Sequence, residues 1–135
     1  MEIEAPKQWI ILRKDLKMRK GKMIAQGAHA SMSVLLQLMD TTEVDGKANR
    51  SFQLPIDSAM NEWIAGAFTK IALSVDSEEE LVKLYESAKF IGLPCSLIED
   101  NGLTEFNGVK TKTAVAIGPA YPSQVAKLTG HLNML

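Results

Sequence analysis

Residues 18–30 read Met-Arg-Lys-Gly-Lys-Met-Ile-Ala-Gln-Gly-Ala-His-Ala, a stretch that predicts a helix with one polar line on a largely apolar surface. At about 100° per residue, the side chains of that line are Lys22, Gln26, His29 and Ser33. The other positions up to residue 39 are small or apolar, which predicts a helix over about 21–39 that is buried on most sides. Polar side chains on such a helix require a cleft, a partner or buried water. The line therefore marks a candidate site.

A block of cations precedes this helix and enters its first turn. Six of the ten residues at positions 13–22 are basic, against a single Asp15: Arg13, Lys14, Lys17, Arg19, Lys20 and Lys22. In a chain of net charge −1, such a block is often no more than a solvated loop. Its place before a helix N-terminus favours a ligand instead, because the N–H groups and the helix dipole there already attract an anion. The block thus indicates a phosphate or carboxylate ligand as the second interpretation.

The composition bounds the class of protein. A chain of 135 residues with 46% hydrophobic side chains can bury a core as one domain, residues 1–135, without disulfides. Cys95 is the only cysteine, which excludes an intramolecular disulfide and a cysteine-cluster metal site and favours a buried strand residue over a nucleophile. The acidic start and the lack of an apolar run near ~20 residues predict a cytoplasmic protein that does not bind membranes.

Strand patterns and helix patterns alternate along the chain. Residues 1–8 are expected to form a tail, and residues 40–57 a mobile loop or insertion. The predicted strands are 9–13, 69–75, 95–98 and 113–117, and the further helices are 58–65, 77–91 and 122–132. Ser77 and Glu80 form a capping-box pattern at the start of the third helix, and Gly92 follows its end. This order predicts an α/β fold, a single three-layer domain with an approximately four-stranded mixed sheet and helices on both faces.

A second polar element follows the third predicted strand, where residues 99–105 read Glu-Asp-Asn-Gly-Leu-Thr-Glu. Ligand sites in open α/β sheets favour the carboxyl ends of strands. We therefore expect Lys22 to pair with Asp100, Thr104 to offer a hydroxyl, and Thr111 and Thr113 to line the opposite wall. An ordinary turn followed by an exposed strand edge is the alternative for this stretch, and a core position is the alternative for His29.

Several segments resemble, in order and spacing, the archaeal and eukaryotic type of peptidyl-tRNA hydrolase, known as the type 2 family. They are residues 13–30, 75–81, 92–104 and 113–120, together with Thr-Gly-His-Leu at 129–132. The resemblance implies an α/β domain, often a homodimer, that cleaves the ester between a peptide and the terminal ribose of tRNA. It also implies that no metal or organic cofactor takes part. The apolar faces of helix 77–91 and of the last helix are then available either to cover the sheet or to form a dimer.

The resemblance assigns roles to particular residues. Lys22, Asp100 and Thr104 match the catalytic positions of that family. For ester hydrolysis we expect Lys22 at the oxyanion or ribose, Asp100 orienting Lys22 or accepting a proton from water, and Thr104 positioning that water. The lowered pKa of an Asp beside Lys⁺ makes it a poor base and favours the orienting role. The polar residues that match the lining of the same cleft are Gln26, His29, Thr111 and Thr113, and Lys20 adds charge toward the tRNA. The remaining cations of the block are the expected contacts to the tRNA backbone: Arg13, Lys14, Lys17 and Arg19.

The chain departs from the family pattern beside the expected site. Glu105 stands where a glutamine is common, and residues 107–110 replace the usual Pro-Gly approach to Thr111. These departures motivate one alternative, a non-catalytic RNA- or protein-binding member of the same fold. A second alternative is a related hydrolase that removes a non-peptide group or a D-amino acid from tRNA, because it would share the same cleft and ester chemistry.

Overall fold

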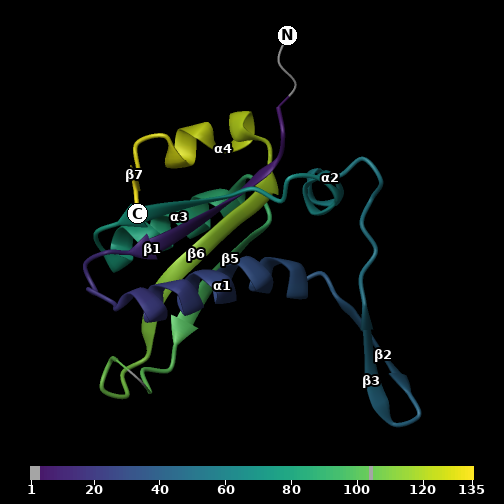
Figure 1. Ribbon diagram of the computed structural model, residues 1–135, viewed down its shortest axis with the longest axis horizontal. Helices are drawn as coiled ribbons and strands as arrows, with labels where there is room; N and C mark the ends of the chain where they lie inside the picture. The colour runs from purple at the N-terminus through teal and green to yellow at the C-terminus, as the bar shows by residue number, and fades with distance from the viewer. Residues whose placement is uncertain (1–3, 104) are drawn as a thin grey trace.

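The computed structural model describes residues 4–103 and 105–135 (Figure 1). The elements in the described part of the chain, in order, are β1 (Lys7–Arg13), α1 (Lys20–Leu36), β2 (Asp40–Val44), β3 (Lys47–Ser51), α2 (Ala59–Ala65), β4 (Lys70–Val75), α3 (Glu78–Phe90), β5 (Cys95–Asp100), β6 (Thr111–Ala120), α4 (Pro122–Thr129) and β7 (Asn133–Met134). The alternation of strands and helices predicted from the sequence is confirmed.

The main sheet has the strand order β5-β6-β1-β4-β7. Only β1 and β4 pair in parallel, and the other neighbours are antiparallel, so the predicted mixed sheet is confirmed. This sheet has five strands in the described part of the chain, against an expectation of about four, because Asn133 and Met134 pair with Ser74 and Leu73 at the edge. A strand of two residues is too short to produce a detectable alternation in the sequence.

Helices cover both faces of this sheet, which confirms the three-layer architecture. On one face, Ala30 and Val34 of α1 and Met60 of α2 pack with Leu12 of β1. On the other face, α3 and α4 pack on Ile11 and its neighbours. Because α3 and α4 use their apolar sides for this second core, those sides are not left over for a dimer. No helix within residues 4–103 and 105–135 combines the length and hydrophobicity of a bilayer-spanning segment.

Strand β1 begins earlier than the sequence suggested, which shortens the expected N-terminal tail. Lys7 and Gln8 belong to the strand, and Gln8 is completely buried. Its amide donates to the carbonyl of Gly118 at 3.2 Å and to that of Ser31 at 3.4 Å, and the hydroxyl of Ser31 donates back to Gln8 Oε1. A polar side chain is accommodated in the core here because all its hydrogen bonds are made.

Helix α1 is less buried than its sequence suggested, and that expectation is wrong. Only the side that faces the sheet is buried, and it is formed by Gln26, Gly27, Ala30, Ser31 and Val34. On the outer side, Ile24 is 73% exposed, Met32 52% and Leu36 54%. The small residues of α1 let its backbone approach the sheet. At Gly27, for example, an added Cβ would lie 3.4 Å from the side chain of Ile10. Ile24, Met32 and Leu36 instead face away from the sheet.

Residues 40–51, expected as part of a loop or insertion, form the hairpin β2–β3. Asp40 pairs with Ser51 and Val44 with Lys47, around a turn at Asp45 and Gly46 that both have positive φ. That conformation is typical of an Asp-Gly turn of type I′. Every residue of both strands is exposed, and the hairpin extends away from the body of the molecule (Figure 1).

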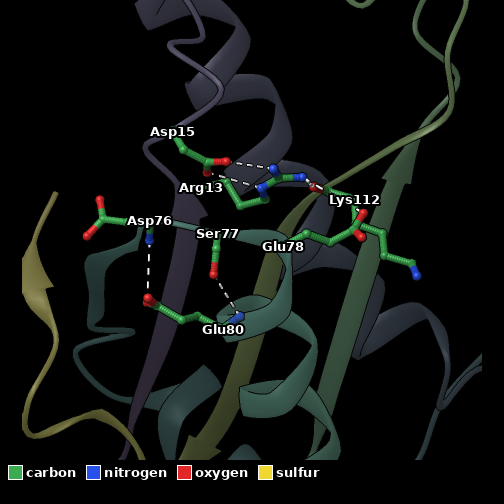
Figure 2. Close-up of polar contacts among 7 residues, drawn as sticks. All are labelled: Arg13, Asp15, Asp76, Ser77, Glu78, Glu80 and Lys112. Atoms are coloured by element: carbon green, nitrogen blue, oxygen red, sulfur yellow. Dashed lines mark hydrogen bonds and ion pairs between the residues drawn. The ribbon is translucent and has the colours of Figure 1, made fainter.

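The start of α3 shows how a local sequence pattern sets a helix boundary. The hydroxyl of Ser77 accepts a hydrogen bond from the backbone N–H of Glu80 at 3.1 Å, as the capping box predicts (Figure 2). The carboxylate of Glu80 reaches the N–H of Asp76 at 3.4 Å, one residue before the N-cap. The cap therefore holds the end of β4 against the helix, and the chain leaves α3 at Gly92 as expected.

Candidate active site

The candidate site lies where β5 ends and α1 begins. Strands β1 and β5 both run antiparallel to β6, so their carboxyl ends lie at the same edge of the sheet. There, Lys22 Nζ lies 2.9 Å from Asp100 Oδ1, and the two side chains are only 12% and 16% exposed. The pairing of these two residues, predicted from the positions of their elements, is confirmed. The cation is held at the positive end of the α1 dipole, so the site attracts negative charge.

Three donors among the described residues hold Asp100. Its Oδ1 accepts from Lys22 and, at 3.2 Å, from Gln26 Nε2, while its Oδ2 accepts from the backbone N–H of Gly102 at 2.8 Å. The hydrogen bond from Lys22 is the main reason that the pKa of this carboxyl lies below its ordinary value; burial opposes the shift, and the bonds from Gly102 and Gln26 add to it. The carboxylate is consequently anionic at neutral pH and a weak base.

A buried relay behind the ion pair fixes its orientation. Thr113, fully buried on β6, donates through Oγ1 to Gln26 Oε1 at 2.5 Å, and Gln26 then donates to Asp100. Since the Oε1 atom of Gln26 accepts the hydrogen bond from the Thr113 hydroxyl, the Nε2 atom of Gln26 must face the Asp100 carboxylate. Gln26 and Thr113 therefore belong to the same cluster as Lys22 and Asp100.

The other predicted lining residues are placed differently. Thr111 lies directly across from Asp100 in the sheet, and its hydroxyl donates to the carbonyl of Val109 at 2.9 Å. His29 is exposed on α1, and it takes no part in the hydrogen bonds of the ion-pair cluster described above. Thr104, predicted as a catalytic residue, lies outside the described residues, so its role stays a prediction.

Arg13 forms internal contacts at this edge of the sheet. Its guanidinium donates to Asp15 at 2.7 and 3.1 Å and to the backbone carbonyl of Lys112 at 3.1 Å (Figure 2). Glu78 lies 3.9 Å away, and the Arg13 side chain is only 11% exposed. This arrangement ties the basic loop to β6, and it leaves Arg13 less suited than its neighbours to the expected contact with a tRNA phosphate.

The remaining cations of the loop point to solvent. Lys14, Lys17 and Lys20 are exposed, and Arg19, the N-cap residue of α1, has a side chain that is 90% exposed. Arg19 also reaches Glu105 at 3.7 Å, across from α1 to the loop between β5 and β6. These four residues are the exposed cations of the segment that leads from β1 into the first turn of α1, and we call them the basic rim.

Sequence reasoning missed Phe106. Its ring lies 5.6 Å from Lys22 Nζ, measured to the ring centroid, and the side chain is half-buried. An aromatic residue within the otherwise polar stretch after β5 was the signal that could have found it. Among the described residues, no group of three or more His, Cys, Asp and Glu side chains is arranged to hold a metal ion.

Comparison of the sequence with known proteins shows the family of this chain. The model of the family described as peptidyl-tRNA hydrolase PTH2 matches residues 6–135. The chain belongs to that family. It is 40% identical to the peptidyl-tRNA hydrolase of Methanocaldococcus jannaschii over 129 residues, which are 96% of this chain and 99% of the relative. The peptidyl-tRNA hydrolases of Methanopyrus kandleri and Saccharolobus solfataricus are 35% and 33% identical, over 96% of this chain and 97% and 98% of theirs.

Membership in the PTH2 family confirms the resemblance seen in the sequence and the enzyme class that it implied, a hydrolase of the peptidyl-tRNA ester. The match includes the departures from the family pattern at Glu105 and at residues 107–110. In the structure, Glu105 faces Arg19, so its charge is opposed by a cation of the basic rim. The non-catalytic alternative is not favoured, because the matching family and the relatives named above are peptidyl-tRNA hydrolases.

Proposed function

We propose that this chain hydrolyses the ester between an N-blocked peptide and the 3′-terminal ribose of tRNA, with Lys22 as its central catalytic residue. The observation that carries the proposal is the largely buried Lys22–Asp100 pair, which follows the exposed cations of the basic rim in the chain. An ammonium held at a helix N-terminus suits a reaction that develops negative charge on oxygen.

The chemistry needs a water molecule and stabilisation of an oxyanion. Water attacks the ester carbonyl carbon, and the carbonyl oxygen takes up negative charge. As the C–O bond breaks, the ribose oxygen leaves with the proton that the attacking water gives up. The positive charge of Lys22 lowers the energy of the oxyanion, an effect of about 3–4 kcal/mol for a well-placed donor. The role of Thr104 in positioning the water rests on the family resemblance alone.

Asp100 acts by positioning Lys22 rather than by accepting the proton of water. Its low pKa makes proton transfer from water unfavourable, whereas its three hydrogen bonds fix both oxygens in place. Thr113 orients the Gln26 amide, and Gln26 in turn donates to Asp100, which supports this orientation. His29 and Thr111 remain proposed contacts to the substrate at the margin of the site.

The tRNA is held mainly through its phosphates, because the attached peptide differs from one substrate to the next. The basic rim, formed by Lys14, Lys17, Arg19 and Lys20, supplies this contact. We place the reaction in the cytoplasm, where translation produces the substrate, and we expect no metal or organic cofactor to be required.

The test is release of N-acetyl-amino acid from N-acetyl-aminoacyl-tRNA in buffer without added metal. We expect rapid release from this substrate and slower release from the same tRNA carrying an unblocked amino acid. A folded protein that binds the tRNA but releases nothing would overturn the hydrolase proposal. Equal release from both tRNAs would point to the alternative of a hydrolase that acts on another acyl group.

The titration of Asp100 provides a separate prediction. We expect its carboxyl to titrate below its ordinary pKa of 3.8, and the Lys22→Ala substitution to move the midpoint upward, because the lysine hydrogen bond is the main cause of the shift. Because the folded-state pKa is depressed, the stabilisation by this pair is present above the unfolded-state value and is lost as the pH falls through the folded-state value. NMR titration of the carboxyl carbon measures both midpoints, and an unchanged value in the variant would contradict the assignment.

We also propose that the chain forms a homodimer, as the family resemblance implies, through the outer side of α1. Ile24, Met32 and Leu36 are more than half exposed there, and an apolar groove of about 370 Å³ beside Ile24 is lined by residues that include Ile10 and Leu135. A surface of this kind is typical of an interface. Light scattering should give twice the chain mass of 14.8 kDa, and Met32→Glu should reduce it to one chain. A monomeric native protein would contradict the proposal.

A further inference from the structure

The loop between β5 and β6 carries an aromatic ring to the reacting groups. Phe106 lies with its ring centroid 5.6 Å from Lys22 Nζ, and the ring is only partly covered. The hydrogen bonds of the ion pair and of the relay through Gln26 and Thr113 do not involve this ring. The ring is therefore available for a role other than holding this cluster together.

The backbone of the loop holds Phe106 in a defined place. The N–H of Val109 donates to the carbonyl of Phe106 at 2.9 Å, and the two residues between them, Asn107 and Gly108, have φ of 50° and 77°. These values define a type I′ turn, the conformation that an Asn-Gly pair favours. Phe106 is the first residue of this tight turn, so its Cα is fixed by the turn geometry.

The loop is also closed at its base. The N–H of Gly108 donates to the carbonyl of Gly102 at 2.8 Å, and a Cβ on Gly102 would lie 2.4 Å from the carbonyl oxygen of Val109. Gly102 has a φ of 78°, so only glycine allows the two sides of the loop to approach this closely.

Two contacts attach this closed loop to the site. Gly102 N–H donates to Asp100 Oδ2 at 2.8 Å, and Glu105 pairs with Arg19 at 3.7 Å on the opposite side, at the start of α1. The position of the Phe106 ring is thus coupled to that of the ion pair. A side chain positioned in this way suits a substrate group that is always the same.

We propose that Phe106 is a stacking platform for the adenine of the 3′-terminal adenosine of the substrate, an inference that rests on the proposed function. Every peptidyl-tRNA ends in the same adenosine, whereas the side chain on the acyl side of the ester varies. A single ribose separates the adenine from the ester, in keeping with the placement of the ring beside Lys22. Base stacking on aromatic side chains is a common means of binding single-stranded nucleic acid ends.

The experiment compares two substrates that differ only in this base. N-acetyl-aminoacyl-tRNA is prepared by chemical acylation with either adenosine or an abasic ribose at its 3′ end, and kcat/KM is measured for native protein, Phe106→Leu and Phe106→Tyr. Leu103→Ala is the matched control, because Leu103 is 87% exposed on the same loop. We expect the native protein to prefer the adenosine substrate by about 10-fold. Phe106→Leu should lose that preference while cleaving the abasic substrate as before, and Phe106→Tyr should retain the preference.

Each other outcome has a distinct meaning. Equal losses on both substrates in Phe106→Leu would overturn the inference and show that the ring supports Lys22 or the acyl group. A native protein that cleaves both substrates equally well would overturn it without any variant, so a misfolded variant does not affect the test. If native protein cleaves neither substrate, the proposed hydrolase function fails, and the inference fails with it.

Discussion

Replacement of Lys22 by alanine is expected to lower kcat for ester release by about 10²- to 10³-fold, the usual effect of removing one group that stabilises an oxyanion. In the proposed mechanism this function rests on one side chain, because the Lys22 ammonium is the cation held by Asp100 within the cluster. The loss should appear in kcat more than in KM, since the oxyanion forms only during reaction. Single-turnover release of N-acetyl-amino acid measures this chemical step directly.

The fold should survive the Lys22→Ala substitution. Asp100 keeps its hydrogen bonds from Gln26 and from the N–H of Gly102, so the carboxylate is not left without donors. Lys20→Ala is the matched control for kcat, because Lys20 lies two residues before Lys22 on the same helix, with an exposed side chain outside the cluster. Native-like kcat in Lys22→Ala, or an equal loss of kcat in Lys20→Ala, would contradict the central role of Lys22.

The meeting of Lys22 and Asp100 could be predicted from the sequence because both lie at element ends. A helix that follows β1 starts near the carboxyl end of that strand, and Asp100 ends β5, whose direction is the same. The general preference of ligand sites for this edge then suffices to bring them together. The relay from Thr113 through Gln26 needs the register of β6 against α1, and this register leaves no local sequence signal.

The errors about exposure have a common physical origin. A helical pattern shows which residues share a side, but it does not show how many sides are covered. The outer side of α1 is apolar and exposed, as at Ile24 and Met32, because α2 packs elsewhere on the same face of the sheet. In the same way, the sequence shows that Arg13 is charged, but its contacts with Asp15 and with the Lys112 carbonyl depend on the tertiary fold.

Binding of tRNA should weaken steeply with salt, and the structure predicts how steeply. The basic rim contributes four exposed cations, whereas Arg13 is engaged with Asp15. If each rim cation neutralises one phosphate, the slope of log K against log salt is about −3 to −4, which lowers the affinity roughly 10²-fold between about 50 and 200 mM salt. Fluorescence titration of labelled tRNA over this range gives the slope.

Removing positive charge at two different sites distinguishes tRNA binding by the basic rim from a general effect of the protein's net charge. The Lys14→Gln/Lys17→Gln double variant should make the slope shallower by about two units, because two phosphate contacts are lost. Lys83 and Lys127 are the matched controls, since both are exposed on α3 and α4, which cover the opposite face of the sheet. A double variant at those two positions should keep the native slope. If instead it flattens the slope as much as the rim variant does, the tRNA is not confined to the rim, and the ester cannot be assumed to reach Lys22 from that side.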